Sequence, residues 1–323
     1  MLLPSAKDLR ICFGHPAYQV KAAFDAMGTG VETFEVKTFD DYASRIGEAD
    51  VVVVSGFWRN ELLEQATRLK FVQSISAGVN QYDPAAFKTH GVRLASAQGV
   101  NMNAVSDHAM SLVLAMARRL PEARDNQAKK FWRPMISDLT QREDELAGKT
   151  MLIVGLGRIG DRLARLAKAF EMNVIGTRFS RVGEASHADE VHSFTALPEL
   201  LPRADYVVLT CPLTPETENL IDATAFAKLK PSSFLVNTAR GACVNEAALV
   251  SALERNAIAG AGIDTTVEEP LAESSKLWSL PNAFVTPHTG GETRQYEINV
   301  ANILRANLEK LWAGDGELVN QIV

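Results

Sequence analysis

A glycine-rich turn between an apolar strand and a helix constrains the fold of this chain most strongly. Residues Met151–Gly160 read MLIVGLGRIG, in which Gly155, Gly157 and Gly160 have the spacing G-x-G-x-x-G. The first glycine allows a tight turn, the second lets the backbone approach a pyrophosphate, and the third lets the helix pack closely on the strand. A glycine turn can also serve packing alone. The strand before it and the helix after it favour a dinucleotide site.

Apolar strands alternate with amphipathic helices on both sides of this turn. In the first hundred residues we expect strands at Leu9–Gly14, Val51–Ser55 and Phe71–Ile75. From Thr150 onward we expect strands at Met151–Val154, Asn173–Gly176, Tyr206–Thr210, Phe234–Asn237, Ala261–Ile263 and Ala283–Thr286. This alternation is typical of parallel sheets with helices on both faces. The sequence therefore predicts an α/β protein with two Rossmann-like, doubly wound parallel-sheet domains.

The length of 323 residues is about twice that of a usual domain and also indicates two domains. Residues 102–120 form a long apolar helix that we expect Pro121 to end, buried between domains or between subunits. Residues Glu292–Trp312 have the pattern of a last helix that returns to the first domain. The expected division is therefore a discontinuous substrate-binding domain, 1–100 and 291–323, and a dinucleotide-binding domain, 101–290, with the active-site cleft between them.

The charge and cysteine content exclude several classes of protein. With 33 basic and 39 acidic residues the net charge is −6, so a broad basic face for nucleic acid is not expected. No apolar run approaches the ~20 residues of a membrane span. Charges at Lys7, Asp8 and Arg10 stand where a secretory signal needs apolar residues, so we expect a cytoplasmic protein. The three cysteines lack metal-ligand spacing, and we expect neither disulfides nor a metal.

The turn after the second strand of the dinucleotide domain lacks the acidic residue that usually holds the adenosine ribose. An NAD site normally has a carboxylate ~20 residues after the glycine turn. Here the residues are Thr177, Arg178, Phe179, Ser180 and Arg181. The arginines Arg178 and Arg181, with Ser180, suit a 2′-phosphate, which predicts that NADP(H) is preferred over NAD(H). A solvated basic turn is the alternative.

Polar side chains follow three later strands of the same domain. Arg240 follows FLVNTA, Asp264 and Glu269 follow AGI, and His288 lies in the turn PHTGG. The carboxyl ends of strands in an open sheet form the ligand edge. An arginine there matches a carboxylate, and a histidine that shares a cleft with a glutamate is a candidate acid–base catalyst.

Together these segments resemble the D-isomer-specific 2-hydroxyacid dehydrogenases, of the glyoxylate/hydroxypyruvate reductase type. VGLGRIG is similar to the nucleotide loop of that family, and residues 209–248 resemble its long signature. AGIDTTVEEP and TPHTGG resemble the two segments that complete its active site. SISAGVNQYD resembles the loop whose amides hold the substrate carboxylate. Arg178 departs from the family members that prefer NAD, which have Asp there.

The resemblance implies a role for each residue of the catalytic trio. Arg240 is expected to bind the substrate carboxylate and to polarise the keto oxygen. His288 is expected to donate a proton to that oxygen during reduction, and Glu269 to orient the imidazole and favour its charged form.

The resemblance also implies the binding residues around the trio. The amides of Gly78 and Val79 would hold the substrate carboxylate. The pyrophosphate would lie on the glycine turn and on Arg158 and Ile159. Around the nicotinamide and its ribose we expect Thr238, Ala239, Arg240, Asp264, His288, Gly290 and Gly291.

The function implied is hydride transfer between NADPH and a small 2-keto acid, of the glyoxylate or hydroxypyruvate type, by a homodimer. The alternative is a dinucleotide-sensing interaction protein of the same fold without significant turnover. The complete trio and the absence of long tails favour the enzyme.

Overall fold

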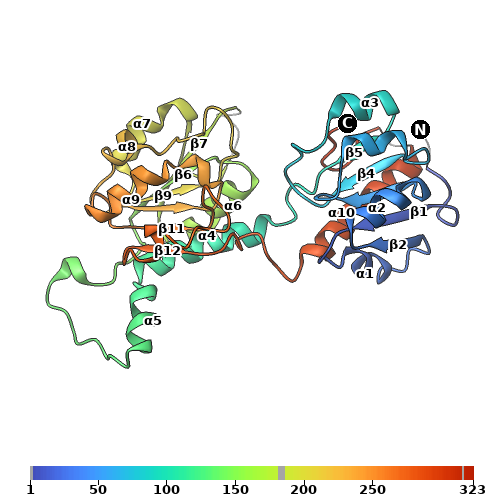
Figure 1. Ribbon diagram of the computed structural model, residues 1–323. Coiled ribbons are helices and arrows are strands. Elements are labelled where there is room, and N and C mark those ends of the chain that lie inside the picture. Colours follow the sequence, from blue (N-terminus) through green and yellow to red (C-terminus); the bar gives the residue numbers. More distant parts are fainter. Residues whose placement is uncertain (1–2, 181–185, 315) are drawn as a thin grey trace. The chain divides into compact units, whose positions relative to one another are not determined.

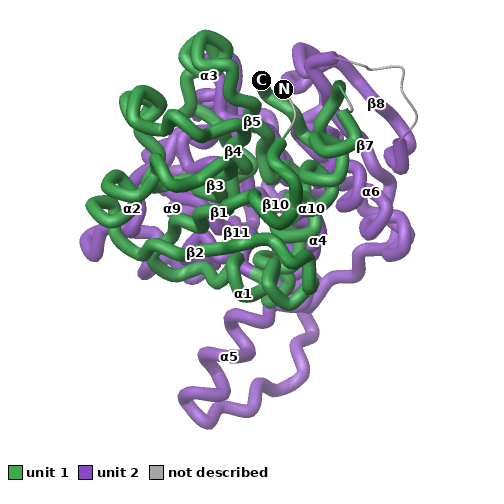
Figure 2. Tube along the Cα trace, turned by 90° about the vertical axis from the view of Figure 1, so that its right-hand side faces the viewer, with its two compact units in different colours: residues 1–101, 293–323 green, residues 102–292 purple. Residues whose placement is uncertain are grey.

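The computed structural model describes residues 3–180, 186–314 and 316–323. The chain forms two compact units, coloured separately in Figure 2. Unit 1 comprises Met1–Asn101 and Thr293–Val323, and unit 2 comprises Met102–Glu292. The chain therefore leaves unit 1 once and returns to it once, so unit 1 is discontinuous in sequence.

Unit 1 is built on a five-stranded parallel sheet with the order β2-β1-β3-β4-β5. Its strands are β1 (Arg10–Gly14), β2 (Glu32–Val36), β3 (Val51–Val54), β4 (Phe71–Ser74) and β5 (Arg93–Ala95). Its helices are α1 (Val20–Asp25), α2 (Phe39–Arg45), α3 (Pro84–His90) and α10 (Tyr296–Ala313). The middle strand β3 is four valines, all buried, as a strand covered on both faces requires.

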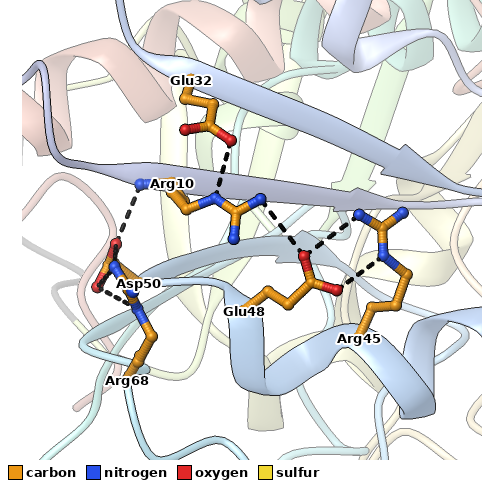
Figure 3. A network of polar contacts seen from close by, with 6 residues as sticks. All are labelled: Arg10, Glu32, Arg45, Glu48, Asp50 and Arg68. Carbon is orange, nitrogen blue, oxygen red and sulfur yellow. Dashed lines mark hydrogen bonds and ion pairs between the residues drawn. The ribbon is translucent and has the colours of Figure 1, made fainter.

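A polar network fastens the amino-terminal edge of this sheet (Figure 3). The Arg10 guanidinium at the start of β1 pairs with Glu32 at the start of β2, 2.9 Å, and with Glu48, 3.3 Å. The buried carboxylate of Asp50 accepts the Arg10 backbone N–H and pairs with Arg68, each at 3.0 Å. These contacts hold the beginnings of three neighbouring strands, at the edge opposite the carboxyl ends.

Unit 2 is built on a seven-stranded parallel sheet with the order β12-β11-β10-β9-β6-β7-β8. Its strands are β6 (Thr150–Val154), β7 (Asn173–Arg178), β8 (Glu190–Ser193), β9 (Tyr206–Leu209), β10 (Phe234–Asn237), β11 (Gly260–Ile263) and β12 (Ala283–Val285). Its helices are α4 (Met102–Ala117), α5 (Leu120–Ala128), α6 (Arg158–Ala169), α7 (Leu197–Leu200), α8 (Ala223–Phe226) and α9 (Glu246–Glu254).

The order of the unit 2 strands creates a switch point at β6. From β6 the chain passes to β7 on one side, and later to β9 on the other side. In open sheets of this kind, ligands bind outside the carboxyl ends of the strands at such a point. The fold of both units is thus the two-sheet parallel α/β architecture that the sequence predicts.

The prediction of a single helix over residues 102–120 is wrong, because this segment contains the end of one helix and the start of another. Helix α4 ends at Ala117, Arg119 adopts a left-handed conformation with φ 49°, and α5 begins at Leu120. Pro121 stands in the first turn of α5, where its missing N–H costs nothing, and so starts a helix instead of ending one. Helix α5 buries none of its residues, and Figure 1 shows it and the chain after it extending away from the sheet of unit 2.

The last helix, α10, packs on unit 1. Val300, Ala301, Leu304 and Leu308 are buried there with residues of β1 and β3. Among the described residues, no helix is both long enough and apolar enough to cross a lipid bilayer.

Candidate active site

The glycine turn has the geometry of a pyrophosphate cradle. Gly155 has φ 102°, and a Cβ there would lie 2.6 Å from the backbone of Cys211. A Cβ at Gly160 would lie 2.5 Å from the carbonyl oxygen of Gly155. Gly157 faces open space instead, so a ligand can approach its backbone. No side chain caps the start of α6, where Arg158 is exposed and Ile159 half-buried, so the first-turn amides suit an anion.

The turn after β7 lies beside this cradle. The Nε–H of Arg178 donates to the carbonyl oxygen of Leu156, inside the glycine turn, at 2.8 Å. Phe179 stacks on Phe194 with ring centroids 4.1 Å apart, and Ser180 is exposed. Arg178 is therefore held against the glycine turn. Arg181 lies outside the described residues.

The loop after β10 presents Arg240. The side chain of Asn237 fixes this loop, because its Oδ1 accepts the N–H of Ala239 and its Nδ2 donates to the carbonyl oxygen of Arg240, each at 3.0 Å. The side chains of Thr238 and Ala239 are buried, so a ligand at this loop would contact mainly their backbone atoms. Arg240 itself is exposed and donates to the carbonyl oxygen of Ala239 at 2.7 Å. The guanidinium thus stands at the carboxyl edge of the sheet, open to a ligand.

His288 and Glu269 form an ion-pair geometry at the same edge. The distance from His288 Nδ1 to Glu269 Oε2 is 2.7 Å, with the side chains 45% and 39% exposed. Glu269 Oε1 accepts the N–H of Thr266 at 3.1 Å, which fixes the carboxylate. Since an ionised carboxylate only accepts hydrogen bonds, Nδ1 carries a proton. The remaining ring nitrogen, Nε2, is the atom that can give or take a proton from a substrate.

Asp264 anchors the turn that carries His288. Its Oδ1 accepts the hydroxyl of Thr286 at 2.6 Å and the N–H of Thr289 at 3.0 Å, and its Oδ2 accepts the N–H of Gly290 at 3.0 Å. Burial works to raise the pKa of Asp264, but the hydrogen bonds from His108 and Thr286 outweigh it and lower that pKa. The carboxylate is thus a buried, charged hub beneath the turn. Gly290 is buried on it, and Gly291 follows half-buried.

The two residues whose backbone amides are expected to hold the substrate carboxylate lie in unit 1. Gly78 and Val79 follow β4, and Gly78 is exposed, with no atom within 4 Å of a Cβ built there. The aromatic side chain of Trp58, also in unit 1, is buried in the core against Tyr82 and Phe87.

The sequence did not single out His108 among the site residues. This residue of α4 lies with its Nε2 2.9 Å from Thr286 Oγ1 and 3.2 Å from Asp264 Oδ1. The available signal was helical spacing, since His108 lies between Val105 and Leu112 on the buried face of an apolar helix.

The arrangement in unit 2 can therefore bind a dinucleotide and, at the same edge, bind a carboxylate through Arg240 and exchange a proton with another oxygen of the same ligand through His288. Residues 110–290 match the family model described as D-isomer specific 2-hydroxyacid dehydrogenase, NAD binding domain.

Three relatives illustrate the similarity. A glyoxylate reductase of Thermococcus litoralis is 35% identical over 286 residues, covering 85% of this chain and 84% of that one. A D-3-phosphoglycerate dehydrogenase of Methanocaldococcus jannaschii is 32% identical over 91% of this chain, which spans only 55% of the length of that relative. The crystal structure of a D-isomer specific 2-hydroxyacid dehydrogenase family protein from Aeromonas salmonicida has a TM-score of 0.81 and 28% identity, covering 98% of this chain and 99% of that one.

Proposed function

The chain belongs to the D-isomer specific 2-hydroxyacid dehydrogenase family, and from this premise we propose that it reduces a small 2-keto acid with NADPH. The observation that carries the proposal is the 2.7 Å contact between His288 and Glu269. This pair and the exposed Arg240 follow the carboxyl ends of strands in the sheet that bears the glycine turn. Unit 2 is then the dinucleotide-binding domain. Gly78 and Val79, which belong to unit 1, are proposed to bind the substrate carboxylate through their backbone N–H groups.

In the proposed reaction, each residue at the carboxyl edge of the unit 2 sheet has its own role. NADPH, when bound, supplies a hydride from C4 of the nicotinamide. Arg240 binds the substrate carboxylate with its planar fork and polarises the keto oxygen. His288 Nε2 donates the proton that the reduced oxygen needs, and Glu269 stabilises the protonated ring and fixes its direction. The same groups run the reverse reaction.

NADPH is favoured over NADH by the turn after β7. The guanidinium of Arg178 is tied to the glycine turn, so a 2′-phosphate on the adenosine ribose gains a charge-assisted contact there. Thr177, Phe179 and Ser180 supply no carboxylate that would hold the 2′-hydroxyl of NADH.

A small keto acid, of the glyoxylate or hydroxypyruvate type, is the proposed substrate. The support is the similarity to a glyoxylate reductase that the chain covers over 84% of its length. The chain spans only about half the length of the similar D-3-phosphoglycerate dehydrogenases. That similarity therefore supports a 2-hydroxy acid substrate in general and not one particular acid.

Spectrophotometric assays test the proposal. We expect NADPH oxidation at 340 nm with glyoxylate and hydroxypyruvate, and slower oxidation with NADH. Binding of NADPH without turnover of any keto acid would favour the alternative, a dinucleotide-sensing interaction protein.

The proposed enzyme is a homodimer formed through unit 2. The chain after α5 exposes large apolar side chains, of which Trp132 is 95% exposed and Met135 fully exposed. Leu139 and Phe131 are also exposed in the same segment. Isolated chains rarely present so much apolar surface on one projecting segment. A second copy of the chain is the occupant that fits it, since α4 and this segment belong to one unit and would meet their own counterparts about a twofold axis.

A further inference from the structure

A second imidazole reaches the catalytic turn from helix α4. His108 Nε2 lies 2.9 Å from Thr286 Oγ1 and 3.2 Å from Asp264 Oδ1. The single hydroxyl proton of Thr286 is directed at Asp264 Oδ1, 2.6 Å away, because a carboxylate can only accept. Thr286 therefore accepts from His108, and Nε2 of His108 carries a proton. His108 thus donates into the pair formed by Thr286 and Asp264.

The donors around Asp264 come from two parts of the chain. Thr286, Thr289 and Gly290 belong to the catalytic segment itself. Among the described residues, His108 is the side chain from outside that segment that hydrogen-bonds Asp264. Asp264 is only 3% exposed, and a buried carboxylate needs such donors to remain charged. The contact ties the catalytic turn to a helix more than 150 residues away in sequence.

Helix α4 is a firm support for this contact. Ala109, Leu112 and Val113 are buried in the core beneath the sheet of unit 2. A Cβ at Gly262 of β11 would lie 3.1 Å from the Cβ of Leu112, so the helix lies close against that strand. On the other side of His108, Asp107 pairs with Arg162 of α6 at 2.6 Å. The imidazole of His108 is therefore held by a helix that packs on the sheet and is tied to α6, the helix after the glycine turn.

We propose that His108 is a positioning residue for the catalytic imidazole. By donating to Thr286 and Asp264, it keeps the carboxylate on the amides of Thr289 and Gly290. Those bonds hold the turn in which His288 has a left-handed conformation, φ 53°, that a non-glycine residue adopts only when its surroundings impose it. Without His108 the turn relaxes and His288 Nε2 leaves its place, while Arg240 and the glycine turn are unaffected.

The kinetic part of the test rests on the proposed function and uses three variants of the full chain. His108→Phe removes the donor, His108→Gln restores an N–H at a similar reach, and Ser111→Ala changes an exposed residue one turn along α4. We expect kcat with hydroxypyruvate to fall about tenfold or more in His108→Phe, since a hydrogen bond to a charged group has at least that weight. KM for the keto acid and Kd for NADPH should change less than twofold. His108→Gln should recover most of kcat, and Ser111→Ala should match the unmodified chain.

The second part does not depend on turnover. Hydrogen exchange of the peptide spanning residues 286–292 reports the amides of Thr289 and Gly290. We expect about tenfold faster exchange in His108→Phe and near-normal exchange in His108→Gln. If His108→Phe does not fold, Thr286→Val removes the bridging hydroxyl and should give the same loss of protection.

The outcomes separate the two proposals. An unmodified chain that reduces no keto acid contradicts the proposed function, and the exchange data then decide on His108 alone. Unchanged exchange in both His108→Phe and Thr286→Val would overturn the positioning role. A parallel rise of KM and fall of kcat in His108→Phe, with no recovery in His108→Gln, would overturn it too, since that result indicates a general loss of structure.

Discussion

Two ring nitrogens of His288 have different tasks in this account. Nδ1 is committed to Glu269, 2.7 Å away, so Nε2 is the nitrogen left for the keto oxygen of the proposed substrate. Glu269 in turn is fixed by the N–H of Thr266. The direction of the proton is thus set by a chain of contacts that ends on the backbone.

Replacing His288 with Gln should preserve shape and some hydrogen bonding but remove the proton donor. General acid catalysis is typically worth ~10²–10⁴-fold, so we expect kcat to fall by that order while Kd for NADPH is kept. Steady-state kinetics and NADPH titration measure both. His90→Gln, at an exposed histidine of unit 1, is the matched control and should have normal kcat. Normal turnover in His288→Gln would remove this residue from the mechanism.

Replacing Arg178 with Asp should reverse the cofactor preference. The unmodified chain should prefer NADPH by roughly ten- to a hundredfold in kcat/KM, because a charge-assisted hydrogen bond contributes ~1.5–3 kcal/mol and each 1.4 kcal/mol is tenfold. Arg178→Asp adds repulsion to the lost attraction. Arg165→Asp makes the same charge change at an exposed position of α6 and should leave the ratio unaltered. Equal kcat/KM for both cofactors in the unmodified chain would mean that Arg178 does not meet the ribose.

At the scale of elements, β8 is the edge strand of the unit 2 sheet, and its charged residues hold it. Glu190 pairs with Arg203 at 2.5 Å and with His192 at 2.8 Å. The Arg203 hydrogen bond, followed by that of His192, lowers the pKa of Glu190 to about 2. A lowered pKa means that the folded state favours the carboxylate, so the stabilisation is complete above pH ~4.5 and is lost as the pH falls towards 2.

Glu190→Gln should therefore destabilise unit 2 in a pH-dependent way. We expect the free energy of unfolding to fall by up to ~1 kcal/mol at pH 7, because the pair is exposed and screened by solvent. The difference should shrink steadily as the pH falls from about 4.5 towards 2. Urea unfolding at several pH values measures it, with Glu273→Gln, an exposed glutamate without an ion pair among the described residues, as control. A difference independent of pH would show that the charge is not the cause.

The elements that the sequence predicts well are those whose pattern is unambiguous. The buried strands β6 and β10 were predicted within a residue because apolar runs end in polar turns. Strands β2, β5 and β8 were not predicted. ETFEV and EVHS are half-exposed edge strands without an apolar run, and the edge strand β5 is only three residues long. Between β3 and β4, where the alternation of strands and helices predicts an amphipathic helix, the chain forms only a 3₁₀ turn at Asn60–Glu64.

Long-range contacts set the other limit on prediction. The trio was predicted because each member follows a strand end, and parallel strands bring their carboxyl ends together. His108 was not, because its partners Asp264 and Thr286 are 156 and 178 residues away, and the polarity of α4 alone gives no hint of them. Strands and turns can be predicted from the local sequence. A contact between a helix and a distant turn depends on how the whole unit packs, so it cannot be predicted in that way.

At the scale of the whole molecule, the two crossings between the units lie close in sequence to His108 and to His288, the proposed catalytic histidine. The chain enters unit 2 at Met102, six residues before His108, and leaves it at Glu292, four residues after His288. The contact of His108 with Thr286 therefore ties the entering and leaving segments together within unit 2.

The proposed dimer belongs to this scale as well. Replacing Trp132 and Met135 together with Ser should shift the chain from dimer to monomer at micromolar concentration, because both side chains are exposed on the segment after α5. Sedimentation velocity measures the change. Phe170→Ser, at an exposed apolar residue after α6, is the control and should remain dimeric. A monomeric unmodified chain would contradict the dimer.

Isotope transfer tests the central claim, direct hydride transfer to C2 of a keto acid, most directly. NADPH carrying two deuterium atoms at C4 is incubated with hydroxypyruvate, and the product is analysed by NMR and on a chiral column. The account predicts glycerate of D configuration with one deuterium at C2, and its loss in His288→Gln. Glycerate with hydrogen at C2, product of L configuration, or no product with any 2-keto acid would contradict it.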